Sequence, residues 1–217
     1  MKRIFDIFGS LLGLLVFAPL LLIVGILIKL TSKGPVIFSQ VRTGLNEKAF
    51  YVYKFRTMVN QADKIGSSVT TGKDPRITPV GRILRRIKFD ELPQLYNVLK
   101  GDMSFVGPRP DVPEITMDYT TEMKRVLQVR PGITSVATLH FRNEEELLAK
   151  VSDPNKFYEE IVVPLKVELT MEHVRNNSFL FDFKILLQTI WMLTPLGKVW
   201  PIKEHEVVKT FKEKYSL

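Results

Sequence analysis

The sequence has 217 residues, 45% of them hydrophobic, a net charge of +8 and no cysteine. This length suits one domain with an appendage, and the apolar content is sufficient for a packed core. The lack of cysteine excludes disulfides and thiolate metal sites. The positive charge favours an anionic partner, which could be a phosphate ligand, a nucleic acid or a lipid headgroup.

The N-terminal segment contains no charged residue from Ile7 to Ile28. As a helix rising ~1.5 Å per residue it would be roughly 33 Å long, about the thickness of the hydrocarbon core of a bilayer. Two arrangements fit it: a straight span, and a hairpin that enters and leaves by the same face. Basic residues flank both ends, so charge does not identify an outer end. Pro19, near the middle, predicts a bend in the helix under either arrangement.

Two extended segments follow the apolar helix. Apolar residues alternate between Val36 and Val41, and the stretch "KAFYVYKFRTM" alternates again. Lys54 and Arg56 end the second segment and would point to the same side of a strand. The pattern therefore predicts a short pair of strands with two cations on one face.

A basic amphipathic helix is predicted over Pro79–Phe89, "PVGRILRRIKF", because its aliphatic residues recur at helical spacing with arginines between them. Two interpretations remain open. The charged face could simply be solvated above a core stripe, or it could lie against an anionic membrane surface or over phosphates.

The next stretch, "DELPQLYNVLKG", predicts a second helix with Asp90 as its N-cap, Pro93 in its first turn and Gly101 as its stop. A capping carboxylate gains ~0.3 to 1 kcal/mol from the helix dipole, so capping alone could explain Asp90. A helix N-terminus also attracts phosphate, and an ionised aspartate is a competent nucleophile toward phosphorus. Under that second reading, Glu91 would help to hold Mg²⁺ or to manage a proton.

The remainder of the chain is predicted to be mostly helical. The proline-rich stretch "DMSFVGPRPDVP" predicts a loop. Apolar periodicity then predicts helices near Glu114–Leu127, Glu144–Leu148, Phe157–Asn176 and Phe181–Leu193. The fold class is therefore mixed α/β, mostly α, with short strands.

Three stretches carry a family resemblance: "KFRTM" (Lys54–Met58), "DELPQLYNVLKGDMSFVGPRP" (Asp90–Pro110) and "VRPGIT" (Val129–Thr134). In this order, after one hydrophobic helix, they closely resemble the bacterial sugar transferases that are monotopic phosphoglycosyl transferases. The resemblance runs from about Lys2 to Thr194.

The resemblance implies transfer of a sugar phosphate from a UDP-sugar to undecaprenyl phosphate, with release of UMP. Such enzymes begin the assembly of capsule, exopolysaccharide or lipopolysaccharide at the cytosolic face of the bacterial inner membrane. It implies a re-entrant membrane anchor over residues 1–33 that breaks at Pro19, a compact catalytic domain over 34–194 with interfacial amphipathic helices, and a basic tail over 195–217. Anionic lipids are expected partners, nucleic acid is not, and a homodimer is allowed.

The resemblance also assigns residues. Asp90 would be the nucleophile that carries a covalent phosphosugar and Glu91 its partner, and both would hold Mg²⁺. Candidates for binding the substrate phosphates are Lys54, Arg56, Arg86 and Arg109. Candidates for contacts with the nucleotide or sugar are Pro110, Arg130, Thr134 and Arg142.

The sequence departs from the family pattern at three places. Ala18 precedes the hairpin proline where serine is common, Arg56 replaces a lysine, and "SVAT" follows the Pro-Gly-Ile-Thr motif in place of Gly-Trp-Ala-Gln. Two rival functions remain. One is a membrane-tethered protein that binds anionic ligands, in which Asp90 is only a cap; the other is an enzyme that transfers the sugar itself and releases UDP.

Overall fold

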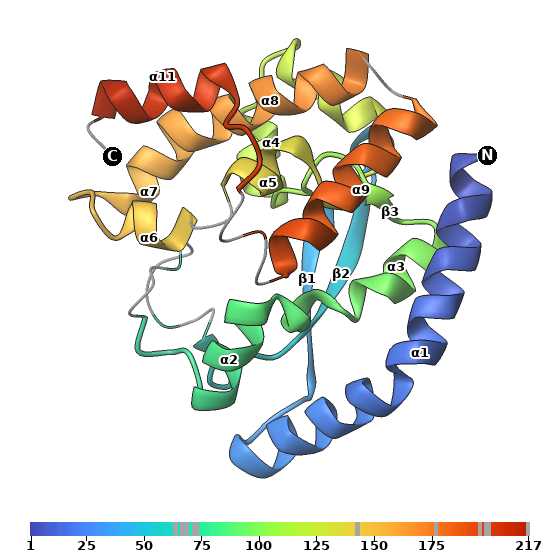
Figure 1. The fold of residues 1–217 in the computed structure, drawn as a ribbon. Helices are drawn as coiled ribbons and strands as arrows, with labels where there is room; N and C mark the ends of the chain where they lie inside the picture. Colours follow the sequence, from blue (N-terminus) through green and yellow to red (C-terminus); the bar gives the residue numbers. More distant parts are fainter. Residues whose placement is uncertain are drawn as a thin grey trace.

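The computed structural model describes residues 1–62, 65, 70, 74–141, 144–175, 178–194, 197 and 201–215. The helices and strands are arranged as a bent N-terminal helix against a mostly helical body (Figure 1). The strands are β1 (Ile37–Thr43), β2 (Ala49–Phe55), β3 (Ser104–Val106) and β4 (Gly132–Thr134). The α-helices are α1 (Lys2–Thr31), α2 (Pro79–Ile87), α3 (Gln94–Lys100), α4 (Pro113–Met117), α5 (Val136–His140), α6 (Glu144–Leu148), α7 (Pro154–Phe157), α8 (Val163–Arg175), α9 (Phe179–Leu193) and α11 (Glu206–Tyr215). The mixed, mostly helical fold class is confirmed.

Helix α1 is the longest element, and Pro19 lies within it. It runs down one side of the molecule, bends and continues along the lower edge (Figure 1). A proline inside a helix removes one hydrogen bond and clashes with the preceding turn, which accounts for the bend. Among the described helices, α1 alone is long and apolar enough to cross a membrane, and only 11% of its most apolar window is buried. This finding supports membrane association.

Both ends of α1 are attached to the same body. Near the N-terminus, Arg3 donates to the carbonyl of Leu99 at 2.8 Å, and Asp6 accepts from the backbone N–H of Phe105 at 3.2 Å. Near the C-terminus, Val24 and Ile28 are buried in an apolar cluster with residues of β2 and α2. The two halves of α1 therefore contact neighbouring parts of one domain.

Strands β1 and β2 form an antiparallel hairpin in which Phe38 pairs with Lys54 and Arg42 with Phe50. The predicted strand pair is confirmed. Strands β3 and β4 form a separate parallel pair, and there a Cβ on Gly132 would lie 2.1 Å from the backbone nitrogen of Gly107. Since no side chain fits at that approach, both glycines allow the Gly107–Pro110 loop to pack directly on β4.

The main core lies among the helices that follow β4. Its buried side chains come from α5, α6, α8, α9 and α11 and include Val136, Leu148, Leu169, Ile185 and Val208. The helices predicted at Glu144–Leu148 and Phe181–Leu193 are confirmed within two residues. The helix predicted from Phe157 is also present, as α7, a single π-helical turn at Tyr158–Val162, and α8; its predicted end, Asn176, lies outside the described residues.

One predicted helix, Glu114–Leu127, is wrong as a single element. The structure has the short helix α4, Pro113–Met117, and then a 3-10 segment, Met123–Gln128. Asp118 leaves helical geometry between them, with φ −84° and ψ 0°. The interruption lets Tyr119 turn inward, where it is buried with Val126 in a second apolar cluster. The boundary predicted at 194/195 stays a prediction, but α11 of the tail adds Val208 and Phe211 to the main core.

Candidate active site

The Asp-Glu pair lies in a tight turn between two helices. Helix α2 ends at Ile87, and Lys88 then adopts left-handed backbone angles, φ 59° and ψ 23°. This reversal starts the 3-10 turn Phe89–Glu91, and α3 begins only at Gln94. The prediction that Asp90 caps the second helix is therefore wrong, because the turn directs Asp90 into the protein. The predicted stop at Gly101 is confirmed, with φ 100°.

Glu91 is the centre of a half-buried ion cluster. Its Oε1 accepts hydrogen bonds from Lys54 Nζ of β2 and from Arg109 Nη2 of the loop after β3, both at 2.7 Å. Burial alone would raise the pKa of Glu91, but the charges and hydrogen bonds of Arg109 and Lys54 outweigh it and hold that pKa well below 4.5. Glu91 is thus ionised and positions two cations that are 37 and 18 residues away in sequence.

Asp90 is in a different chemical state from its neighbour. Its side chain is buried, and its Oδ1 has no hydrogen-bond partner among the described residues. Burial, and next the negative charge of Glu91, raise the pKa of Asp90, while Lys54, Lys88 and Arg85 act against that rise. The lone pairs of this Asp90 oxygen are not engaged by any described residue, whereas those of Glu91 are used to hold two cations.

Asn97 attaches α3, which follows the Asp90–Glu91 turn, to β2, which carries Lys54. It is fully buried, its Nδ2 donates to the carbonyl of Tyr51 at 2.7 Å, and its Oδ1 accepts from the backbone N–H of Tyr53 at 3.1 Å. These bonds attach α3 to the outer edge of β2. Lys54, the next residue of β2, is thereby held opposite Glu91.

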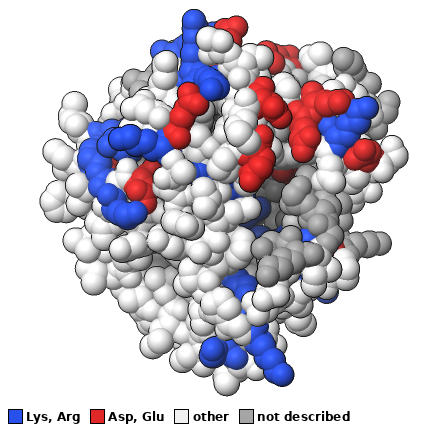
Figure 2. Space-filling model, turned by 180° about the vertical axis from the view of Figure 1, so that it is seen from behind, with Lys and Arg blue, Asp and Glu red and all other residues white. Residues whose placement is uncertain are grey.

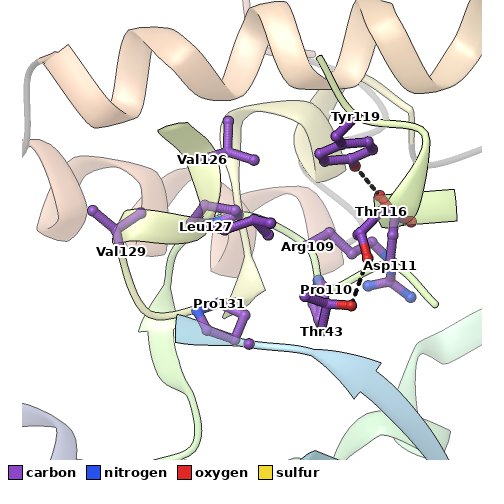
Figure 3. A pocket seen from close by; sticks show the side chains of 12 residues that line it. Thr43, Arg109, Pro110, Asp111, Thr116, Tyr119, Val126, Leu127, Val129 and Pro131 are labelled. Carbon is purple, nitrogen blue, oxygen red and sulfur yellow. Dashed lines mark hydrogen bonds between the residues drawn. The ribbon is translucent and has the colours of Figure 1, made fainter. Parts of the chain in front are cut away.

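A small pocket lies beside Arg109 (Figure 3). In it, Asp111 accepts hydrogen bonds from the hydroxyls of Tyr119 at 2.8 Å and Tyr158 at 3.4 Å. Burial, and next the charge of Asp111, raise the pKa of Tyr119, so its hydroxyl stays a donor. Thr43 reaches the same wall, where its hydroxyl lies 2.7 Å from that of Thr116. These bonds fix the loop that carries Arg109.

The structure brings together four of the predicted site residues, Asp90, Glu91, Lys54 and Arg109. Pro110 lies next to them in the same loop, and its carbonyl accepts from Arg42 at 3.3 Å. These five residues come from three separate stretches of the chain.

Other predicted residues lie elsewhere. Arg56 donates to the carbonyls of Ser32 and Lys33, at the end of α1, at 2.9 and 2.8 Å. Arg86 is exposed on α2, whereas Arg85 is half-buried and bonds Thr57. The remaining predicted contacts divide as follows: Arg130 donates to the carbonyl of Gly101, Thr134 is bonded to Thr189, and Arg142 lies outside the described residues.

Sequence analysis missed Arg42, Asn97, Asp111 and the two tyrosines. Asn97 and Asp111 fall inside or just after the long motif that carries the resemblance, so the motif marked them without giving a role. Arg42 stands in "VRTG", a stretch with no distinctive chemistry. Only the pairing of the strands shows that Arg42 and Lys54 belong to one face.

The sequence profile that describes bacterial sugar transferases matches residues 1–195. The chain belongs to the bacterial sugar transferase family. It is therefore an enzyme of the transferase class, and the cluster around Asp90 and Glu91 is where its chemistry is expected.

Individual proteins similar to this sugar transferase have names that fit the family. This chain is 40% identical over 196 residues to the undecaprenyl-phosphate glucose phosphotransferase of Komagataeibacter xylinus, and the match covers 87% of this chain and 35% of the relative. It is 41% identical to the exopolysaccharide production protein PSS of Rhizobium leguminosarum bv. phaseoli, over 91% of this chain and 97% of the relative. It is 39% identical to the UDP-glucose:undecaprenyl-phosphate glucose-1-phosphate transferase of Escherichia coli, over 88% of this chain and 39% of the relative.

Proposed function

We propose that this sugar transferase moves a sugar 1-phosphate from a UDP-sugar to undecaprenyl phosphate, as the first membrane step of bacterial surface glycan assembly. The observation that carries the proposal is the contrast between two adjacent carboxylates. Asp90 has a buried oxygen that no described residue hydrogen-bonds, and Glu91 holds two cations beside it. The printed activities of the relatives from Komagataeibacter and Escherichia coli support the same reaction class.

The reaction proceeds in two displacements through Asp90. In the first, a carboxylate oxygen of Asp90 bonds the sugar-bearing phosphorus, the bond from that phosphorus to the bridging oxygen breaks, and UMP leaves with the electron pair. In the second, a phosphate oxygen of undecaprenyl phosphate bonds the same phosphorus and the aspartyl bond breaks. The carboxylate is restored and no proton is consumed. Two steps let one site serve a soluble donor and a lipid acceptor in turn.

Lys54 and Arg109 supply the electrostatic part of catalysis. Phosphoryl transfer depends mainly on positioning and on neutralising the phosphate oxygens. Because Glu91 bonds both cations, they are preorganised before the substrate arrives. Burial lowers the pKa of Lys54, and the charge of Glu91, which Lys54 Nζ bonds at 2.7 Å, opposes that fall.

The residues fit a magnesium ion through Asp90. Magnesium in phosphoryl-transfer sites is commonly held by one or two carboxylates together with substrate phosphates. The unpartnered Oδ1 of Asp90 is such a ligand, whereas both oxygens of Glu91 already face Arg109. No group of three or more His, Cys, Asp or Glu side chains that could hold a metal occurs among the described residues. In the proposal, substrate phosphates would complete the coordination. When bound, Mg²⁺ would neutralise the diphosphate.

The anchor is proposed to be re-entrant. A spanning helix would place its ends on opposite faces of the membrane, but Arg3 bonds the carbonyl of Leu99 and Arg56 bonds that of Ser32, at the two ends of α1. Both contacts are to the catalytic body. The bend in α1 would then be the deepest point of the hairpin, with exposed side chains such as Leu15 and Leu22 in the acyl region.

Anionic lipids are the proposed partners of the lower end of the molecule. Seen from behind, basic side chains there stand without acidic neighbours, whereas both signs mix in the upper half (Figure 2). The elements at that end are α2 and the second half of α1 (Figure 1). Helix α2 exposes Arg82, Arg86 and Lys88 together with Ile83 and Ile87, a combination suited to headgroups at the cytosolic face.

The deciding experiment follows the donor's phosphorus. The protein, in membranes with undecaprenyl phosphate and Mg²⁺, is given a panel of UDP-sugars labelled at the sugar-side phosphate. We expect label in the lipid, UMP in solution, and a labelled protein adduct when the acceptor is omitted. Asp90→Asn should lose both product and adduct. Release of UDP without label in the lipid, or full activity of Asp90→Asn, would refute the proposal.

Topology is tested separately. Because the chain has no cysteine, a single cysteine can be placed in an N-terminal tag or at the exposed Lys33. An impermeant thiol reagent should label both sites from the same side of sealed vesicles. Labelling from opposite sides would show that α1 spans the membrane.

A further inference from the structure

One face of the β1–β2 hairpin carries three polar side chains, Lys54, Gln40 and Arg42, among apolar ones, and they form a row across the two strands. Opposite residues of an antiparallel pair point to the same face, so the pairs Phe38 with Lys54 and Arg42 with Phe50 place Lys54 and Arg42 on one side. Four residues along a strand correspond to about 13 Å, which separates the backbone positions of the two cations. Lys54 reaches Glu91 at one end of this row.

Arg42 is held at the other end by neutral groups. Its Nη2 donates to Gln40 Oε1 at 2.7 Å and its Nη1 to the carbonyl of Pro110 at 3.3 Å. The next residue, Thr43, donates its backbone N–H to the carbonyl of Asp111 at 3.0 Å, so the end of β1 is fixed to the loop of Arg109. Figure 3 shows Thr43 against this loop.

The charge of Arg42 has no carboxylate partner within ion-pair distance among the described residues. Lys54 and Arg109, by contrast, both pair with Glu91. Burial, and next the like charge of Arg109, lower the pKa of Arg42. A partly desolvated guanidinium beside a second one is unfavourable until an anion joins them, and a bound phosphate oxygen would do so with charge-assisted hydrogen bonds.

A chain of contacts connects the acidic pair with Arg42. Lys54 and Arg109 both donate to Glu91 Oε1, the neighbour of Asp90 in sequence. Arg42 in turn donates to the carbonyl of Pro110, the residue after Arg109. Arg109 thus connects the Asp90–Glu91 end of the site with the Arg42 end. In an in-line displacement the leaving oxygen lies on the far side of phosphorus from the nucleophile.

We propose that Arg42, together with Arg109, binds the nucleotide-side phosphate of the donor and stabilises it as it leaves. This inference rests on the proposed function, since it needs Asp90 to attack the sugar-side phosphorus. As the bond from that phosphorus to the bridging oxygen breaks, the electron pair stays on that oxygen, which becomes part of the departing nucleoside monophosphate. Two guanidinium groups at this position match the charge that develops.

The test compares UMP with uridine, which differ by the phosphate alone. Binding of each to the full chain in detergent is measured by ligand-observed NMR titration. Arg42→Gln should weaken UMP binding about 10- to 100-fold, the range for hydrogen bonds to a charged group, and leave uridine binding unchanged. Arg42→Lys keeps the charge but loses the planar pair of N–H donors. Its affinity for UMP should lie between those of Arg42→Gln and the unmodified protein.

Lys124→Gln is the matched control, because it removes one positive charge from a half-exposed residue that is paired with Glu47. It should change neither ligand's binding. Equal losses of UMP and uridine binding in Arg42→Gln would show that Arg42 only stabilises the Pro110 loop. No loss of binding for either ligand would show that Arg42 is not part of the binding site. Either result would overturn the inference. The titration needs no turnover. Selective loss of UMP binding in a protein that never releases UMP would refute the proposed reaction and leave the phosphate site standing.

Discussion

Two ion clusters in this molecule hold charge in different ways. Around Glu91, Lys54 and Arg109 both bond one carboxylate, and a second carboxylate, Asp90, adjoins it in sequence. Around Asp182, Lys2 Nζ lies at 2.5 Å and His173 Nδ1 at 3.5 Å. Each cluster has buried polar atoms without a hydrogen-bond partner among the described residues, Asp90 Oδ1 in the first and both Asp182 oxygens in the second. What differs is the surroundings: the first cluster lies beside the Arg109 loop and its pocket, whereas the second joins α1 to α8 and α9.

The largest effect should come from breaking the first cluster at its centre. Glu91→Gln leaves Lys54 and Arg109, which are half-buried, without their anion. Removing one partner of a fully buried ion pair costs about 3 to 5 kcal/mol, so a smaller loss of stability is expected here. If the cations then leave their positions, turnover falls about 10²- to 10³-fold, to be measured as UMP release. Glu91→Asp, which keeps the charge on a shorter side chain, should retain more activity. Equal activity of Glu91→Gln and the unmodified protein would show that the cluster does not position the cations.

The second cluster should respond in stability and not in chemistry. Asp182→Asn removes the anion beside Lys2 and should lower the free energy of unfolding by about 1 to 3 kcal/mol. For a domain of this size, each kcal/mol corresponds to about 2 to 4 °C in Tm. UMP release by the folded variant should be unchanged at temperatures well below its Tm. A large loss of turnover in fully folded Asp182→Asn would contradict the separation of roles.

The pH dependence of turnover should sharpen the contrast between Asp90 and Glu91. In the proposed mechanism Asp90 reacts as the carboxylate, and its raised pKa should make activity fall on acidification at a higher pH than for an ordinary aspartate. The charge of Lys54 opposes that rise. Lys54→Met should therefore shift the acidic limb of the pH–rate profile further upward, while Lys54→Arg leaves it near its original place. A downward shift in Lys54→Met would exclude Asp90 as the titrating group.

A smaller pH effect is expected on stability. Burial lowers the pKa of His173 below 6.5, Asp182 opposes that fall, and Lys2 adds to it. Between the two pKa values the unfolded chain binds the proton and the folded one does not, so stability decreases as the pH falls below 6.5. The Tm, measured between pH 7.5 and 5, should drop less steeply in His173→Leu. Identical slopes would assign the loss to other groups.

The features that the sequence predicts and those that it does not differ in how far apart in sequence the interacting residues are. The apolar length of α1, the alternation in β2 and the stop at Gly101 depend on neighbours in sequence and were predicted from it. Asp90 was misassigned as a cap because the left-handed residue before its turn, Lys88, carries no local signal. Arg56 was placed with Lys54 because both face one way in a strand, but the strand ends at Phe55 and Arg56 bonds the end of α1.

The missed residues have long-range causes. Arg42 is a neighbour of Arg109 because of the register of the hairpin and the course of the Pro110 loop, neither of which the local sequence specifies. Asn97 acts on backbone groups of β2 that are 44 and 46 residues away. Tyr158 contributes from another helix to a carboxylate 47 residues earlier. Such contacts have no periodicity or spacing from which they could have been read.

The attachment of α1 also sets an order of events during synthesis. The groups that hold its first residues, the carbonyls of Leu99 and Val106, follow about 100 residues later in the chain. At ~5 to 20 residues per second, the apolar helix leaves the ribosome roughly 5 to 20 s before its partners exist. In the proposed re-entrant arrangement, α1 would enter the membrane during that interval. Its first residues would bind the body only after residues 99–106 have been synthesised.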